Sequence, residues 1–303
     1  MDADTLILKV PAKVNLSLDI TGKRADGYHT LRSIFQTVSV YDMLTIRKVG
    51  ADTPFSLSCN VEGIPCDARN LVTKAAMALL GDAPCGIAMH LEKQIPSQAG
   101  MGGGSADCAA ALLGLRALLS LPVSDAQLHT IAAKLGADVP FFLMGGTVLA
   151  EGIGERLTPL AAPPARILVL AKGNEGVSTP QAYGRIDHLA APPKPSTDAV
   201  LQQLYQEPSD LFPVCANAFD AVTDLEEIRQ IRTIMLQHHA NPVLSGSGAA
   251  VFCGFASQTE AHACAEALRN AKLPFVTVCQ TVSHGVVQLT ESGEHPLAIA
   301  KID

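Results

Sequence analysis

Residues 95–119 read IPSQAGMGGGSADCAAALLGLRALL, a glycine-rich segment that passes at once into an apolar, helix-like sequence. Glycine occupies positions 100, 102, 103 and 104, although it loses more conformational freedom on folding than any other residue. A backbone that curls tightly and directs its N–H groups at a ligand would use so many glycines. Because the segment leads into a helix N-terminus, its amides and the helix dipole would favour an anion such as a nucleotide phosphate.

The segment differs from two common phosphate-binding motifs. No Lys-Ser/Thr pair follows its last glycine, so it is not a Walker A sequence. Ser105 stands where the dinucleotide fingerprint has its last glycine, which makes a dehydrogenase the weakest alternative. From this segment alone, a tight turn that packs a helix against a sheet stays open beside phosphate binding.

Composition narrows the class of protein. The chain has 303 residues, 48% hydrophobic and 17% charged, which predicts a well-packed globular protein of two domains. Its net charge of −7 argues against a nucleic-acid partner. The acidic N-terminus and the absence of a long apolar run predict a cytoplasmic protein with no membrane partner. Eight cysteines without a C-x-x-C pair predict reduced thiols and no zinc site.

Apolar periodicity predicts interleaved strands and helices. The clearest strand, over residues 10–20, has one apolar face and one polar face that carries Lys13, Asn15, Ser17 and Asp19. Because the expected helices are clustered along the chain, the pattern favours α+β layers over a doubly wound sheet. The other expected elements are strands at 33–46, 87–91, 167–171 and 275–282, a hairpin at 241–255, and helices at 68–80, 105–119, 125–135, 198–239 and 258–271, with a polar loop that ends near residue 183.

Proline marks the domain boundary. Residues 158–166 hold three prolines in an aperiodic stretch. We therefore expect an N-terminal domain over residues 1–158, a C-terminal domain over 166–285 and a C-terminal tail over 286–303.

Four segments resemble, in their order and spacing, the GHMP kinase superfamily. They are PAKVNLSLDITGKRADGYHTLRSIFQTVSVYD (11–42), IPSQAGMGGGSADCAAAL (95–112), LGADVPFFLMGGTVLAEGIGERL (135–157) and VLSGSGAAVF (243–252). The glycine segment and SGSG mark only the superfamily. The K-x-N-L and DGYH blocks together with GADVPF are similar to those members that phosphorylate a methylerythritol carrying cytidine diphosphate.

The resemblance implies a fold and an activity. The fold would be a two-domain α+β GHMP kinase fold, with the active-site cleft between an N-terminal ATP-binding domain and a smaller ferredoxin-like C-terminal domain. The activity would be transfer of the γ-phosphoryl group of ATP, with Mg²⁺, to a tertiary 2-hydroxyl in non-mevalonate isoprenoid biosynthesis.

The resemblance also implies the catalytic residues. Asp138 matches the catalytic aspartate and Lys13 the lysine beside it. A carboxylate near the hydroxyl can take its proton, and an ammonium can stabilise charge on the transferred group and keep the carboxylate ionised. Asn15 would be a polar substrate contact.

The glycine segment matches the ATP phosphate-binding motif. Ser105 would be the hydroxyl near the phosphates or Mg²⁺, because Ala106 stands where many relatives have a second hydroxyl residue. The implied ATP-binding residues are Pro96, Ser97, Gln98, Ala99, Gly100, Met101, Gly102, Gly103, Gly104, Ser105 and Ala106.

Three aromatic residues would recognise the cytosine. The resemblance implies that Tyr28 stacks on the ring, that His29 supplies hydrogen bonds and that Tyr183 stacks on the other face. Base–aromatic stacking is worth about 1–3 kcal/mol per base. Without the resemblance, Tyr28 and His29 would be no more than a polar hairpin tip.

Two alternatives stay open at this point. One is another small-molecule kinase of the superfamily, such as a homoserine or mevalonate kinase, which needs no cytosine site. The other is a catalytically silent nucleotide-binding regulator, which loss of Lys13 or Asp138 would favour, yet both residues are present. The sequence leaves a monomer and a homodimer equally open.

Overall fold

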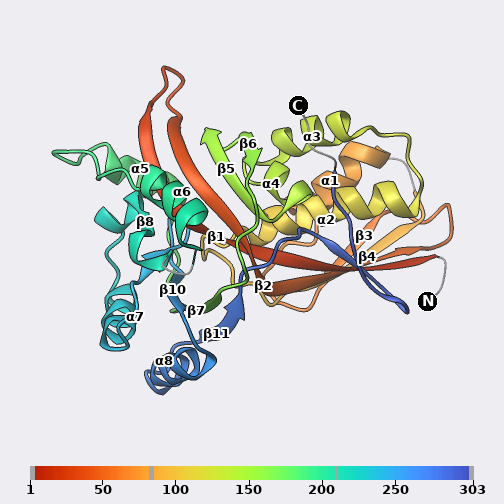
Figure 1. Cartoon of the computed structure of the whole chain (residues 1–303). Helices are drawn as coiled ribbons and strands as arrows, with labels where there is room; N and C mark the ends of the chain where they lie inside the picture. The colour runs from red at the N-terminus through yellow and green to blue at the C-terminus, as the bar shows by residue number, and fades with distance from the viewer. Residues whose placement is uncertain (1–3, 82–84, 209–210, 300–303) are drawn as a thin grey trace.

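The computed structural model describes residues 4–81, 85–208 and 211–299. Two sheets organise this part of the chain (Figure 1). The larger has nine strands in the described residues: β1 (Thr5–Lys23), β2 (His29–Lys48), β3 (Ser56–Cys59), β4 (Ile87–Glu92), β5 (Thr147–Gly152), β6 (Arg156–Pro159), β8 (Ala216–Asn217), β12 (Val287–Thr290) and β13 (Gly293–Pro296).

The smaller sheet belongs to the second half of the chain. Its strand order is β11-β7-β10-β9, and every pairing in it is antiparallel. Its four strands are β7 (Ile167–Lys172), β9 (Val243–Leu244), β10 (Val251–Phe255) and β11 (Phe275–Gln280). Since β6 ends at residue 159 and β7 begins at 167, the proline-rich stretch joins the two sheets.

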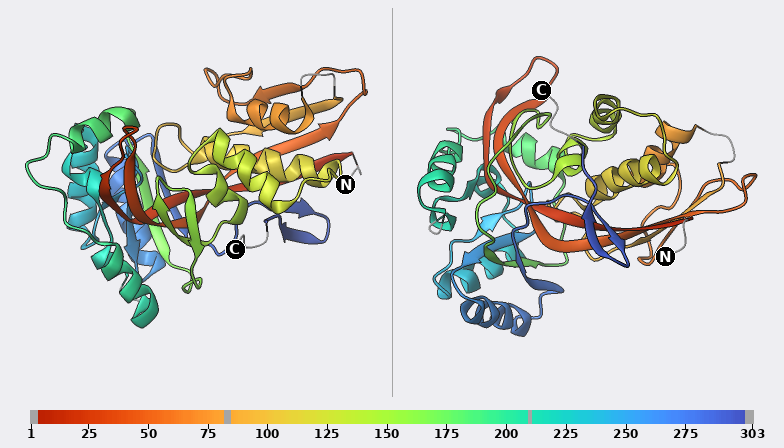
Figure 2. Two further views of the ribbon diagram at one scale, coloured as in Figure 1. Left: turned by 90° about the horizontal axis from the view of Figure 1, so that it is seen from above. Right: turned by 45° about the vertical axis from the view of Figure 1, so that its right-hand side comes forward.

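Helices cover both sheets (Figure 2). Helices α1 to α4 pack beside the first sheet, while α7 and α8 pack on the second. The described helices are α1 (Leu71–Leu80), α2 (Gly103–Leu118), α3 (Asp125–Leu135), α4 (Val139–Met144), α5 (Thr179–Ile186), α6 (Thr197–Gln206), α7 (Glu226–Gln237) and α8 (Gln258–Asn270), with short 3-10 turns at Phe212–Val214 and Ala218–Ala221. The predicted α+β class is confirmed.

The long hairpin of β1 and β2 is the frame of the molecule. The two strands pair antiparallel from Thr5 opposite Arg47 to Lys23 opposite His29, with register shifts on the way. Bulges of this kind bend a strand and increase its twist. Strands β12 and β4 pair with one end of the hairpin, and β5 and β8 pair with the other.

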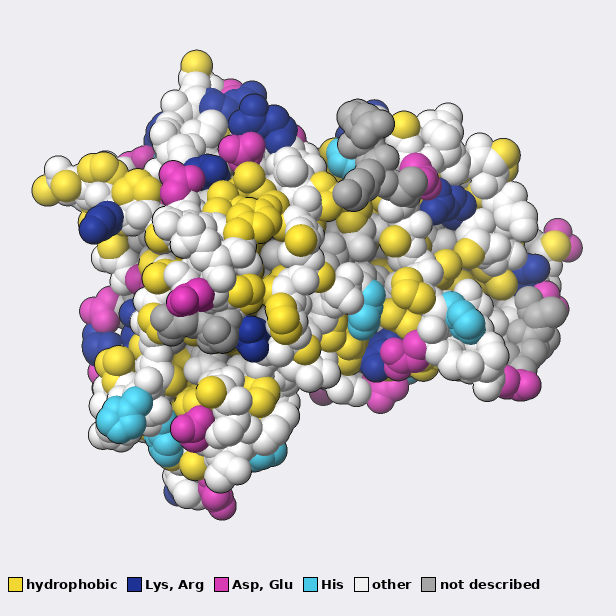
Figure 3. Space-filling model, viewed as in Figure 1, with side chains coloured by type: hydrophobic (Ala, Val, Ile, Leu, Met, Phe, Trp, Pro, Cys, Tyr) yellow, Lys and Arg dark blue, Asp and Glu magenta, His cyan; other side chains and the backbone are white. Residues whose placement is uncertain are grey.

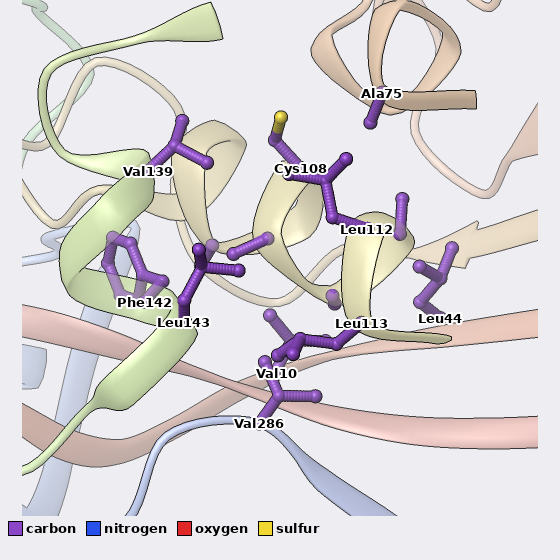
Figure 4. Close-up of a cluster of buried hydrophobic side chains, with 14 of the residues drawn as sticks. Val10, Leu44, Ala75, Cys108, Leu112, Leu113, Val139, Phe142, Leu143 and Val286 are labelled. Atoms are coloured by element: carbon purple, nitrogen blue, oxygen red, sulfur yellow. The ribbon is translucent and has the colours of Figure 1, made fainter. Parts of the chain in front are cut away.

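Helix α2 forms the centre of the larger core (Figure 4). Its residues from Ala106 to Leu115 are all buried, so the helix is enclosed on every side and not only on the face that the leucines mark. In Figure 4, Leu112 and Leu113 lie among side chains of β1, β2, α1 and α4. The glycine segment is thereby attached to a helix that lies within the larger core.

Three sequence predictions differ from the structure. Helix α2 begins at Gly103, two residues before the predicted start, because Gly102 adopts φ 73° at the N-cap position. Tyr183 lies in α5 and not at the end of a loop, since Pro180 at the start of that helix fixes a helical φ. The predicted tail contributes β12, which pairs with β1 at residues 7–9, because its alternating apolar residues complete the sheet.

Three further features concern the thiols, the helices and the surface. All eight cysteines are free thiols. No helix among the described residues is long and apolar enough to cross a membrane. On the face drawn in Figure 3, acidic and basic side chains are interspersed.

Truncation of Leu112 tests the role of α2 in the core. Leu112 is fully buried, so Leu112→Ala should lower the free energy of unfolding by about 2–5 kcal/mol in urea titrations. Leu236→Ala on α7 is the matched control, because that side chain is 59% exposed and its loss should cost less than about 0.5 kcal/mol. Equal effects of the two substitutions would contradict this view of the core.

Candidate active site

The glycine segment lines a cavity of about 420 Å³ at the start of α2. The first amides of a helix have no acceptor within the helix. In α2 the first helical hydrogen bond joins Ala106 N to Gly102 O. The amides of residues 103–105 are therefore available to an anion. The other lining residues include Ile64, Asn70, Leu91, Lys93 and Asp107.

Two glycines of the segment are needed for packing. Gly100 has φ 71°, and a Cβ there would lie 1.8 Å from the carbonyl oxygen of Ser245. Gly102 has φ 73°, and a Cβ there would lie 2.6 Å from the ring of Phe142. At Gly104, in contrast, a Cβ would meet its nearest neighbour at 3.9 Å. A tight turn therefore explains the glycines at positions 100 and 102. Packing does not require glycine at position 104, where the backbone faces the cavity.

The segment is held by the turn at residues 245–248 and by β1. Ala249 N and Ala250 N donate to the carbonyl oxygens of Gln98 (3.1 Å) and Ala99 (3.1 Å). Ser245 Oγ donates to Gly100 O at 3.0 Å, and Lys13 N donates to Met101 O at 3.0 Å. The SGSG sequence, expected to be a hairpin turn, therefore fixes the cavity wall from the second half of the chain.

Lys13 and Asp138 meet beside this wall. Lys13 is 3% exposed, and its Nζ lies 3.7 Å from Asp138 Oδ2. Asp138 occupies the N-cap position of α4 but makes no side-chain capping bond there, which leaves its carboxylate directed at Lys13. Burial lowers the pKa of Lys13, and the nearby Asp138 carboxylate opposes that shift. The structure thus brings the two predicted catalytic residues together.

Asn15 supports Lys13 from the same strand. Its Oδ1 accepts from Lys13 Nζ at 2.7 Å and from Gly246 N at 2.9 Å. Its Nδ2 donates to Ser33 Oγ at 2.9 Å. The side chain is 1% exposed and bonded to protein groups at both of its polar atoms, so in this structure it orients Lys13.

A buried ion cluster that sequence reasoning missed contributes to the wall of the cavity. Lys93 Nζ bonds Asp42 Oδ2 and, at 2.6 Å, Asp107 Oδ2, while Asp42 Oδ1 accepts from the amides of Gln94 and Ile95. Burial acts against the charge of Lys93, but the two carboxylates outweigh it and raise its pKa. Burial and the charge of Asp42 raise the pKa of Asp107 to about 8. Asp107, a charged residue inside the apolar sequence of α2, was the feature of the sequence that could have indicated this cluster.

His29 and Tyr183 also come together, although 154 residues separate them in the sequence. Their rings stack at 4.8 Å with an angle of 19° between the planes. Tyr183 contacts Phe219 edge-on, and burial, helped by Asp138, raises the pKa of its hydroxyl to about 12. Tyr28 is 63% exposed at the hairpin tip and makes no aromatic contact within the described residues. The structure therefore brings His29 and Tyr183 together and leaves Tyr28 apart from them, and the cytosine sandwich stays a prediction.

Comparison with known proteins identifies the family. The model of the GHMP kinases N-terminal domain matches residues 70–146. The chain is 39% identical over 284 residues to the 4-diphosphocytidyl-2-C-methyl-D-erythritol kinase of Geotalea daltonii, a match that covers 92% of this chain and 99% of that protein. The chain belongs to the 4-diphosphocytidyl-2-C-methyl-D-erythritol kinase family. The resemblance seen in the sequence is confirmed.

Solved structures agree with this family. A crystal structure of 4-(cytidine 5'-diphospho)-2C-methyl-D-erythritol kinase superposes with a TM-score of 0.75 at 33% identity, over 91% of this chain and 98% of that one. The homoserine kinase of Cytophaga hutchinsonii superposes with a TM-score of 0.67 at 19% identity, over 94% of this chain and 97% of that one. The second match shows a shared fold alone.

Removal of the Lys93 ammonium should destabilise the protein strongly. Lys93→Met would leave the buried side chains of Asp42 and Asp107 without their cation, at an expected cost of about 3–5 kcal/mol in the free energy of unfolding. Lys9→Met is the matched control, because Lys9 pairs with the half-exposed Glu294 and its loss should cost less than about 1 kcal/mol. Similar urea midpoints for both variants would refute a structural role for the cluster.

The raised pKa of Asp107 should give stability a definite pH dependence. Its pKa of about 8 in the folded protein exceeds the usual value of 3.8, so the folded state holds the proton more tightly. That contribution to stability is present at low pH and is lost as the pH rises towards 8. Between about pH 5.5 and 8.5, the free energy of unfolding should fall less for Asp107→Asn than for the wild type. If the free energies of unfolding of Asp107→Asn and the wild type, measured in urea titrations, changed with pH in parallel, the raised pKa of Asp107 would be contradicted.

Proposed function

We propose that the protein transfers the γ-phosphoryl group of ATP to the 2-hydroxyl of 4-diphosphocytidyl-2-C-methyl-D-erythritol, a step of non-mevalonate isoprenoid precursor biosynthesis. The observation that carries the proposal is the buried Lys13 beside Asp138, next to the glycine-lined cavity at the start of α2. Family membership supports the choice of substrate. The expected setting is cytoplasmic, as a monomer or homodimer without a nucleic-acid or membrane partner.

In this mechanism the residues position groups and hold charge. The Asp138 carboxylate takes the proton of the 2-hydroxyl while that oxygen forms a bond to the γ-phosphorus. The bond from the γ-phosphorus to the β,γ-bridging oxygen breaks, and ADP leaves. The Lys13 ammonium, held by Asn15 at 2.7 Å, stabilises negative charge on the transferred group.

The amides of residues 103–105 would hold the phosphates of ATP in the cavity. The residues present fit Mg²⁺ carried mainly by the nucleotide, since Mg²⁺ typically binds one or two protein oxygens and several from phosphates and water. Ser105 would supply such an oxygen, while the Asp138 carboxylate is kept for the hydroxyl proton. Bound Mg²⁺ would neutralise charge on the β- and γ-phosphates.

The substrate's cytosine would bind beside His29 and Tyr183. Tyr183 forms one wall, and its hydroxyl lies near enough to Asp138 for that carboxylate to raise its pKa. The base end and the catalytic end of the proposed site are therefore close enough for the charge of Asp138 to act on Tyr183. Tyr28, at the exposed hairpin tip, would close onto the base from the solvent side.

Substrate specificity is tested by phosphorus NMR of reactions that contain ATP and Mg²⁺. A new phosphomonoester should form on the cytidyl substrate but not on homoserine or mevalonate. Asp138→Asn should lower kcat by about 10²–10⁴-fold, because proton transfer from the hydroxyl loses its acceptor. Turnover of another alcohol would overturn the substrate, and nucleotide binding with no turnover would favour a silent regulator.

A methyl group at Gly104 should separate nucleotide binding from stability. Its Cβ would meet no atom closer than 3.9 Å, so Gly104→Ala should unfold at the wild-type urea midpoint or above it. If phosphates lie against this backbone, the methyl should raise the Kd for ATP about tenfold in calorimetry, a change of about 1.4 kcal/mol. Gly100→Ala is the contrast, since its Cβ would overlap the backbone of Ser245 and lower stability itself. Unchanged ATP affinity in Gly104→Ala would remove phosphates from this part of the cavity.

A further inference from the structure

A carboxylate that the proposed mechanism does not use joins the hairpin tip to helix α5. Asp187 directly follows α5, and its Oδ1 lies 2.6 Å from His29 Nε2. Its Oδ2 accepts from Lys23 Nζ at 2.5 Å. Lys23 ends β1 and His29 begins β2, so the carboxylate holds both arms of the hairpin at its tip (Figure 1).

The same contacts fix the ring of His29. The side chain of His29 is 8% exposed, although its neighbour Tyr28 is 63% exposed. One face of the imidazole stacks on Tyr183, which lies one helical turn before Asp187 in α5. A carboxylate can only accept hydrogen bonds, so Nε2 carries the hydrogen and the ring is fixed in both orientation and tautomer.

We propose that Asp187 is a positioning residue for cytosine recognition, which sets the distance between the hairpin tip and the Tyr183 ring by binding His29 and Lys23. This inference rests on the proposed function. Without Asp187, the base would have to order the hairpin tip against α5 as it binds, and that cost would appear in the affinity for the cytidine part. The phosphoryl-transfer residues Lys13 and Asp138 make no contact with Asp187 among the described interactions.

A second ion pair between the two halves of the chain provides a matched control. Arg32 of β2 donates to Asp198 of α6 at 2.5 Å, and the Asp198 side chain is 85% exposed. Like the contacts of Asp187, this ion pair joins the hairpin to a helix of the second half. It contacts neither His29 nor Tyr183 among the described interactions.

The experiment compares Asp187→Ala, Asp187→Asn and Asp198→Ala in the full-length enzyme. Asp187→Ala should raise the KM for the cytidyl substrate about tenfold, while kcat and the KM for ATP stay within about twofold of the wild type. Asp187→Asn should have a smaller effect on that KM, because its amide oxygen can still accept from His29. Asp198→Ala should leave all three constants within about twofold of the wild type.

Inhibition by substrate fragments locates the effect. The Ki of cytidine diphosphate as a competitive inhibitor should rise with the KM in Asp187→Ala, whereas the Ki of 2-C-methyl-D-erythritol 4-phosphate should not change. An unchanged KM, an unchanged Ki for cytidine diphosphate, or an equal effect of Asp198→Ala would overturn the proposal. So would a joint loss of kcat, both affinities and thermal stability, which would mean a purely structural role.

The wild-type reaction separates the two proposals. If the wild type fails to phosphorylate the cytidyl substrate, the proposed function fails and the inference falls with it. If the wild type is active and Asp187→Ala keeps its KM, only the inference fails. Should Asp187→Ala not fold, Lys23→Ala removes one arm of the contact, and a wild-type KM in both Lys23→Ala and Asp187→Asn would then count against the proposal.

Discussion

A single buried ammonium group organises the candidate active site. An unpaired charge in the interior costs several kcal/mol, so the Lys13 ammonium needs partners, and the structure supplies two. Asn15 on the same strand accepts from its Nζ, and Asp138 at the start of α4 lies 3.7 Å away. Its backbone amide bonds the glycine segment at Met101. The side chain and the backbone of this one residue thus bring together the strand, the loop and the helix that the proposed chemistry requires.

The glycine segment depends on the same frame. Asn15 also accepts from Gly246, and the turn that contains Gly246 contacts the segment closely enough to exclude a side chain at Gly100. A loop held on both sides can keep its free amides in place before a ligand arrives, which is how preorganised donors act in catalysis. The glycines thus allow two close contacts with protein, and at Gly104 they leave space for a ligand.

The strand and the glycine loop of the candidate site could be predicted from the sequence, because each depends on a pattern of neighbouring residues. Alternation along residues 10–20 predicted the strand, and the run of glycines predicted the loop before a helix. The predictions failed where the answer depends on packing. Nothing local shows that both faces of β1 are buried, or that Asp107 meets a lysine from a neighbouring strand. The resemblance supplied Asp138, since an aspartate before an apolar helix is by itself more often a cap.

The polar row of β1 shows how one strand serves two purposes. Lys13 and Asn15 face the glycine segment and the turn at Gly246, while Asp19 accepts from the amides of Ser196 and Thr197 at the start of α6. The N-cap residue of α6, Ser196, makes no side-chain capping bond, so the Asp19 carboxylate from β1 caps the start of α6 and attaches it to the first half of the chain. The strand that presents Lys13 is therefore also the strand on which the second half docks, and a shift between the halves would be felt at Lys13 and Asp138.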